Sequence, residues 1–152
     1  MRAFPHQYTV RAAASPDGDV LLSGEQLTRL ASASPAAFGG PGDRWSPETL
    51  LVGAVADCFV LTFRAIARVA KMPWIALTCN ATGTLDRVDH VSQFTAFVVH
   101  ASLEVPAGVD QEQARRLMLR AEQTCLVSNS LKASCRFEAD VRAVETAAAA
   151  SA

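Results

Sequence analysis

The longest helical pattern in the sequence runs from residue 46 to about residue 71. Ser46 is a preferred helix N-cap, Pro47 fits the first helical position, and Glu48 lies beside the positive end of the helix dipole. The polar side chains beyond them recur seven, four and three residues apart, which is one narrow stripe on a helix: Asp57, Arg64, Arg68 and Lys71. A helix with so little polar surface must be covered on nearly all sides, so we expect it to pack against a sheet and against another helix or a second subunit.

After Pro73 the hydrophobic period changes from helical to alternating. Residues 75–86 alternate between apolar and polar side chains, which is typical of a half-buried strand. A second run at residues 94–105 is rich in Phe and Val. Because only a short polar link separates the two runs, we expect an antiparallel pair of strands.

A second helix and a final strand are predicted toward the C-terminus. Asp110 followed by Gln113 is typical of a helix N-cap. The apolar positions that follow have helical spacing: Ala114, Leu117, Met118, Ala121 and Cys125. Cys125 is therefore expected at the end of this helix on its core-facing side. Alternation returns at residues 131–142 and predicts a strand.

The N-terminal part is predicted to form a hairpin. Residues 8–10 and 20–22 are short β-prone pieces around a turn at residues 15–19, and residues 31–43 are typical of a surface loop. The pattern as a whole predicts an α+β fold, with antiparallel sheets packed around a long central helix and a second helix. We expect a single domain over residues 1–144 and a disordered alanine-rich tail at residues 145–152.

Composition narrows the location and the partners of the protein. The chain has 152 residues, 14 Lys+Arg against 15 Asp+Glu, and no basic cluster, which argues against nucleic acid and anionic membranes as partners. The N-terminus lacks the apolar core of a secretory signal. The longest apolar run, residues 50–63, is interrupted by Asp57 and is too short to span a bilayer. We therefore expect a cytoplasmic protein, in which stabilising disulfides are uncommon.

Of the residues that could carry chemistry, the cysteines are the strongest candidates. The three histidines have no metal-ligand spacing, and residues 39–42 lack the ending of a phosphate loop. Cys79 and Cys135 fall on the apolar faces of predicted strands, where a cysteine is usually an inert small hydrophobe. Cys58 and Cys125 each belong to a helix face, but a separation of 67 residues says nothing about their distance in space.

Two segments together resemble the signature of the OsmC/Ohr family of thiol peroxidases. The family pattern is Pro-Glu-x-Leu, a cysteine ten residues after the glutamate, and a late helix that ends in Cys-Pro-Val-Ser. The matching segments of this chain are SPETLLVGAVADCF at residues 46–59 and AEQTCLVSNSL at residues 121–131. The resemblance implies the family's α+β fold over about residues 8–143 and an intertwined homodimer.

Carried over residue by residue, the resemblance makes Cys58 the peroxidatic thiol, Cys125 the resolving thiol and Glu48 an acid near the site. It implies reduction of organic hydroperoxides, alkyl or lipid, to alcohols. The intermediates would be a sulfenic acid on Cys58 and a Cys58–Cys125 disulfide. It implies no bound cofactor. The reductant would be an external dithiol, such as dihydrolipoamide or a lipoylated protein, and the site would lie between two subunits.

The sequence departs from the family pattern at two positions. The family uses an arginine to hold the thiolate, and in one branch this arginine lies where the present chain has Phe38. Arg11, Arg29 and Arg44 are the remaining candidates, and Arg44 is preferred because it is nearest in sequence to Glu48. The second departure is a leucine at position 126, where the family usually has proline after the resolving cysteine.

Two other functions stay open at this stage. A non-catalytic binding module of the same fold would use its pocket for an apolar small molecule and its cysteines for packing. A peroxide sensor would form the same disulfide but would lack a fast reductant. Turnover with a dithiol separates the enzyme from the sensor, because a sensor is oxidised once whereas an enzyme cycles.

Overall fold

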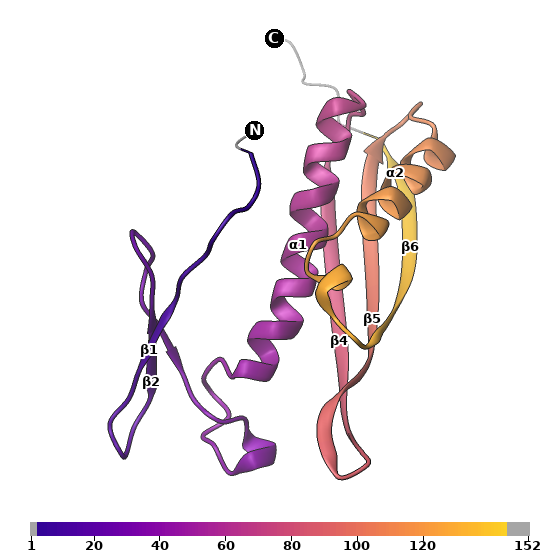
Figure 1. The fold of residues 1–152 in the computed structure, drawn as a ribbon. Helices are drawn as coiled ribbons and strands as arrows, with labels where there is room; N and C mark the ends of the chain where they lie inside the picture. The colour runs from indigo at the N-terminus through magenta and orange to yellow at the C-terminus, as the bar shows by residue number, and fades with distance from the viewer. Residues whose placement is uncertain (1–2, 146–152) are drawn as a thin grey trace. The chain divides into compact units, whose positions relative to one another are not determined.

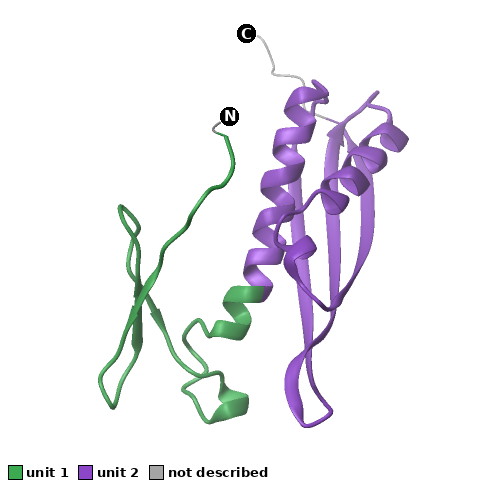
Figure 2. Cartoon of the chain, viewed as in Figure 1, with its two compact units in different colours: residues 1–51 green, residues 52–152 purple. Residues whose placement is uncertain are grey.

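The computed structural model describes residues 3–145, which form two compact units. The boundary between the two units falls between Leu51 and Val52, within the first turns of a long helix, α1 (Figure 2). A single domain over residues 1–144 stays a prediction. The predicted tail lies, from residue 146 onward, outside the described residues.

The first unit contains a small antiparallel sheet of three strands. Its strands are β1 (Arg11–Ala13), β2 (Val20–Ser23) and β3 (Leu30–Ser32), in the order β1-β2-β3. The hairpin is confirmed, but its first strand lies three residues later than predicted. The pairing of β1 with β2 runs from Ala13 opposite Leu21, beside the turn, to Arg11 opposite Ser23. Residues 8–10 precede this paired region. The third strand was missed, because three residues are too few for an alternating pattern to show.

The second unit contains a mixed sheet in the order β4-β5-β6 (Figure 1). Strand β4 (Ala76–Val88) pairs with β5 (Val91–Pro106) in antiparallel fashion, as predicted, through a two-residue turn. Both turn residues, Asp89 and His90, have positive φ, which is the conformation such hairpins require.

The prediction of wholly antiparallel sheets is wrong for the last strand, because β6 (Ser134–Val144) runs parallel to β5. The connection between them contains helix α2 (Gln111–Gln123), which carries the chain back along the sheet so that β6 can run in the same direction as β5. The sequence pattern predicted this helix and this strand separately. It did not predict that the strand would run parallel to β5.

Helix α1 (Pro47–Val69) begins where its sequence predicts and ends two residues early. Ser46 and Thr49 cap its first turn reciprocally. The amide of Thr49 donates to the Ser46 hydroxyl at 3.2 Å, and the amide of Ser46 donates to the Thr49 hydroxyl at 2.8 Å. The backbone of Lys71 adopts a positive φ, which turns the chain toward β4.

The core of the second unit lies between its helices and one face of the sheet (Figure 1). Helix α1 buries every fourth residue on this side: Val55, Phe59, Phe63 and Ala67. Helix α2 contributes Ala114, Met118 and Ala121. Strand β5 buries alternate side chains between them: Phe97, Val99, Ala101, Leu103 and Val105. These two periods match the sequence patterns that predicted the elements.

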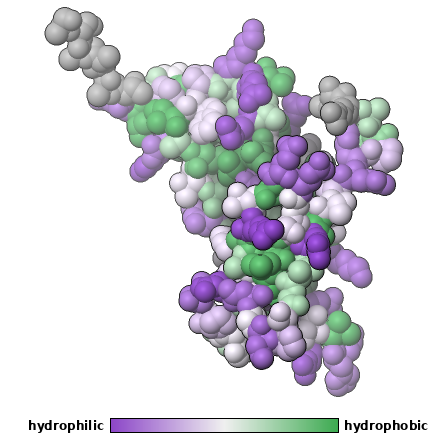
Figure 3. Space-filling model, turned by 90° about the vertical axis from the view of Figure 1, so that its left-hand side faces the viewer, coloured by the Kyte–Doolittle hydropathy of each residue, from purple (hydrophilic) through white to green (hydrophobic). Residues whose placement is uncertain are grey.

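Within the single chain, α1 is covered by the sheet on one side, and the further cover expected from a second subunit stays a prediction. Leu61 is 52% exposed and Val69 is 85% exposed, although both are large apolar residues. Hydrophobic side chains interrupt the polar surface in the space-filling view as well (Figure 3). By length and composition α1 could cross a membrane. A stripe of buried residues nevertheless packs α1 on the sheet, and a cytoplasmic location stays a prediction.

We expect the N-cap of α2 to contribute measurably to stability. The Asp110 carboxylate accepts hydrogen bonds from the amides of Glu112 at 2.9 Å and Gln113 at 3.1 Å. Asp110→Ala should lower the free energy of unfolding by about 1 kcal/mol, because both amides lose their acceptor. Urea denaturation followed by circular dichroism measures the change. Asp110→Asn keeps an acceptor and should lie close to wild type, and an equal loss in both variants would contradict the capping argument.

Candidate active site

Cys58 lies on α1 beside the stripe that packs on the sheet. Its neighbour Phe59 is buried in the core, so the helical turn of about 100° per residue places Cys58 at the edge of the buried face, half-buried. One turn later on the same face, the Thr62 hydroxyl lies 4.0 Å from the Cys58 sulfur. The cysteine is therefore held on a rigid element yet partly open to solvent.

Cys125 lies in the tight turn that follows α2. The helix ends at Gln123, with Thr124 as its C-cap, which is two residues before Cys125, where the pattern predicted its end. It is on the core side as expected, and its side chain is only 1% exposed. The turn continues into a single 3-10 turn, η2 (Ser128–Ser130), before β6 begins.

The structure brings the thiols of Cys58 and Cys125 together. Both are free thiols, and they lie close enough for each to affect the pKa of the other. The Cys125 thiol is one of the donors that lower the pKa of Cys58, and the proximity of Cys58 adds to the burial that raises the pKa of Cys125. Sequence spacing left this proximity open. The roles of the two residues in a reaction stay a prediction.

The pKa of Cys58 is lowered overall, although burial on its own raises it. Four donors outweigh the burial by hydrogen bonding to the sulfur: the Val127 amide, the Cys125 thiol, the Thr62 hydroxyl and the Leu126 amide. For Cys125 burial prevails over the opposing contacts of Ser128, so its pKa is raised. The pair thus joins one thiol with a greater tendency to ionise and one that keeps its proton.

The other two cysteines lie on the inward face of the sheet, as the strand patterns predicted. Burial raises the pKa of Cys79 to about 11 and also raises the pKa of Cys135. Both are therefore protonated at neutral pH and poor nucleophiles. This environment agrees with the interpretation that they are small core residues.

An open groove of about 520 Å³ gives access to Cys58. Its walls come from α1 and from the turn after α2, and most of its side chains are apolar: Ala54, Leu61, Ala65, Leu126 and Val127. Asp57, Thr62 and Thr124 are the polar lining residues. The groove can therefore accommodate an apolar molecule directly beside the thiol with the lowered pKa.

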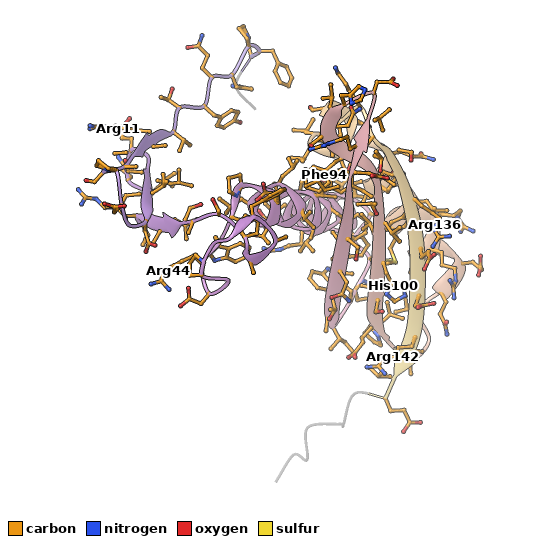
Figure 4. The ribbon with its side chains drawn as sticks, turned by 90° about the horizontal axis from the view of Figure 1, so that it is seen from below. Arg11, Arg44, Phe94, His100, Arg136 and Arg142 are labelled. Atoms are coloured by element: carbon orange, nitrogen blue, oxygen red, sulfur yellow. The ribbon has the colours of Figure 1, made fainter. Side chains whose placement is uncertain are left out.

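Glu48 and Arg44 belong to the first unit. The Oε2 atom of Glu48 is buried, and within the described part of the chain it has no hydrogen-bond partner. Arg44, the arginine that the sequence favoured as the activating group, is already engaged. Its Nε atom lies 2.9 Å from Asp19 and its Nη1 atom lies 3.0 Å from Asp43. Figure 4 shows Arg44 on the loop before α1 and Arg11 at the start of β1.

A metal site finds no support among residues 3–145, where no three His, Cys, Asp or Glu side chains are grouped so as to hold an ion. His100 pairs with Asp140 at 2.7 Å, joining β5 to β6. Both side chains are substantially exposed, so the pair is an ordinary surface contact of the sheet. This agrees with the interpretation of His100 as a strand residue.

The sequence interpretation missed the donors that surround Cys58. Thr62 could have been found, because a hydroxyl four residues after a cysteine lies on the same helix face. The amides of Leu126 and Val127 are backbone groups and have no side-chain signal. The only sequence requirement for such a donor is that the residue is not proline, because proline has no backbone N–H.

The fold and the paired thiols define an α+β protein with a two-cysteine site on a helix and an adjoining turn. The family model for OsmC-like proteins matches residues 40–140, and the chain belongs to this family. Among curated relatives, the uncharacterized protein YmaD of Bacillus subtilis (strain 168) is 22% identical over 125 residues, covering 80% of this chain and 82% of YmaD.

Two solved structures share the fold closely. An OsmC-like protein of unknown function from Vibrio cholerae O1 biovar eltor superposes with a TM-score of 0.82 at 14% identity, covering 89% of this chain and 99% of the other. A Legionella pneumophila protein named organic hydroperoxide resistance protein OsmC superposes with a TM-score of 0.71 at 24% identity, covering 93% and 100%. The family and α+β fold implied by the sequence resemblance are therefore confirmed.

The difference between the cysteine environments predicts selective alkylation. In reduced protein at about pH 7.5, iodoacetamide should label Cys58 first, because a lowered pKa gives a larger thiolate fraction. Cys79, with a pKa of about 11, should be labelled last. Peptide mapping by mass spectrometry after timed quenching measures the order. Equal labelling rates for Cys58 and Cys79 in the folded protein would contradict this picture.

Proposed function

We propose that the protein is a cysteine-based hydroperoxide reductase that converts organic hydroperoxides, alkyl or lipid, into alcohols. The observation that carries the proposal is the adjacency of Cys58, whose pKa is lowered, and Cys125, whose pKa is raised. Membership of the OsmC-like family supports it, since the matching Legionella protein is named for organic hydroperoxide resistance.

The reaction would begin with attack of the Cys58 thiolate on the terminal oxygen of the hydroperoxide. The O–O bond breaks, the sulfur is oxidised to a sulfenic acid, and the alkoxide takes up a proton and leaves as an alcohol. The Cys125 sulfur then attacks the Cys58 sulfur, its proton leaves with the hydroxyl as water, and a disulfide forms. A dithiol such as a dihydrolipoyl group would reduce that disulfide by two exchange steps and leave oxidised.

The shape and lining of the groove favour an organic substrate. An apolar R group can bury surface against Ala54, Leu61 and Ala65, with a gain of about 25 cal/mol for each Å² removed from water. Hydrogen peroxide has no such group. We therefore expect alkyl hydroperoxides to react faster than hydrogen peroxide.

We further propose that the working form is a homodimer in which one copy completes the site of the other. Glu48 precedes Cys58 by ten residues on one helix, which corresponds to about 15 Å of rise, beyond the reach of a glutamate side chain. Glu48 could then act at a Cys58 site only if that site belongs to a second copy. The exposed apolar side chains Leu61 and Val69 on α1 offer a surface for such pairing.

The buried Oε2 atom of Glu48 lacks a hydrogen-bond donor among the described residues of one chain, and an arginine of a second copy could supply one. Arg44 is already paired with Asp19 and Asp43. Arg11 and Arg29 line one small groove of about 170 Å³, and within residues 3–145 no carboxylate lies within 4.0 Å of either guanidinium. We propose that one of these two arginines pairs with Glu48 in the dimer.

A thiol count tests the peroxidase. One equivalent of cumene hydroperoxide should remove two thiols and about 2 Da from the reduced protein. Cys58→Ser should stay inert, and Cys125→Ser should accumulate sulfenic acid or more oxidised sulfur at Cys58. Cys79→Ser and Cys135→Ser are matched controls that should react like wild type. Intact-mass spectrometry with thiol titration provides the measurement.

Persistence of all four thiols after minutes with excess oxidant would rule out the peroxidase and favour a binding module. Rapid oxidation without turnover, on addition of dihydrolipoamide or dithiothreitol, would instead favour a sensor. Multiple turnovers with either dithiol would support the enzyme.

Mixed dimers test the shared site. Co-expressed Glu48→Gln and Cys58→Ser subunits, each slow or inactive alone, should recover roughly a quarter of the wild-type rate, because half of the randomly assembled dimers carry one intact site of two. Light scattering should give about twice the chain mass of 16.1 kDa. A monomeric protein with full activity would contradict the shared site.

A further inference from the structure

The turn after α2 presents two backbone N–H groups to the Cys58 sulfur. Leu126 and Val127 line the same groove as Cys58, and their backbone N–H groups lower the pKa of the Cys58 thiol. Within the described residues, no carbonyl or side-chain oxygen accepts a hydrogen bond from either amide. Two N–H groups without another acceptor, beside a half-buried sulfur, form a site for a negative charge.

The neighbouring carbonyl groups fix the direction of these amides. The carbonyl of Cys125 accepts from the Asn129 amide at 3.1 Å, and the carbonyl of Leu126 accepts from the Ser130 hydroxyl at 2.8 Å. In a planar trans peptide the N–H points opposite to the preceding carbonyl. Anchoring these two carbonyls therefore holds the amides of Leu126 and Val127 in place.

The side chain of Leu126 does not explain the choice of residue. It is 72% exposed and covers little of the core. Its backbone has a distinct property, because the usual proline of the family at this position has no N–H to donate. The arginine expected near position 38 is a phenylalanine here, and Arg44 is engaged with Asp19 and Asp43. The departures from the family pattern at Phe38 and Leu126 thus both change the groups that could stabilise the Cys58 thiolate.

We propose that the backbone N–H groups of Leu126 and Val127 stabilise the Cys58 thiolate in place of an arginine side chain, and that leucine at position 126 is present because it supplies one of them. The effect of these N–H groups on Cys58 does not depend on the proposed function, whereas their role in catalysis rests on it. In it Leu126 is a catalytic residue through its backbone, and Ser130 and Asn129 are positioning residues.

The test is the pKa of Cys58, read from the pH dependence of iodoacetamide alkylation and requiring no peroxide. Leu126→Pro removes the N–H and should raise the pKa by about one unit, with about tenfold slower alkylation below that pKa. Leu126→Ala is the matched control for the pKa, since it removes the side chain but keeps the N–H, and it should leave the pKa of Cys58 unchanged. Circular dichroism and thermal melting check that each variant is folded.

Ser130→Ala provides a second variant that does not depend on proline. It releases the Leu126 carbonyl and should raise the pKa of Cys58 by less than Leu126→Pro does, whereas Ser130→Thr should restore it. If folded Leu126→Pro and Ser130→Ala keep the wild-type pKa, the inference is overturned. The same holds if Arg11→Gln or Arg29→Gln produces the whole shift instead.

Peroxide turnover of the same variants separates the two proposals. A raised alkylation pKa in Leu126→Pro, together with a wild-type protein that consumes no hydroperoxide, would support the amide site and refute the peroxidase. A fall in the peroxide rate without a change in the Cys58 pKa would support the peroxidase and refute the amide site.

Discussion

The packing of one stripe of α1 against the β4-β5-β6 sheet determines where the reactive groups can lie. Val55, Phe59 and Phe63 fix the rotation of the helix about its axis, and that rotation leaves Cys58 at the edge of the buried face. Helix α2 packs on the same face of the sheet, so the turn that follows it meets α1 at the height of Cys58. A change in either helix packing would separate the two thiols without touching them.

The second physical theme is the unequal environment of four cysteines in one small unit. Hydrogen-bond donors lower the pKa of Cys58, whereas burial raises the pKa of the other three. Ionisation makes a sulfur more nucleophilic, and a neighbouring thiol that keeps its proton can donate to the ionised one. At neutral pH the thiolate form is thereby favoured at Cys58 over the other three cysteines.

Much of the fold could be predicted from the sequence because its signals are local. The cap at Ser46, the period of α1 and the alternation of β4 each depend on a few adjacent residues. The parallel direction of β6 depends on a long connection through α2, and β3 is too short for a pattern. Only part of the site could be predicted, because Cys58 and Cys125 were identified through a family resemblance and not from local patterns. The donors at Leu126 and Val127 are backbone N–H groups, which have no side-chain signal. The pairing of Arg44 with Asp19, which lies 25 residues earlier, could not be found from sequence spacing.

The long chain segment between Cys58 and Cys125 makes the stability of the fold depend on whether the two sulfurs are linked. Between Cys58 and Cys125 lie β4, β5 and α2, which is most of the second unit. A covalent link between these positions would close a loop of 67 residues. Restricting an unfolded chain in this way lowers its entropy and favours the folded state by about 4 kcal/mol. Oxidation would then make the protein harder to unfold, and reduction would return it to a more easily unfolded state.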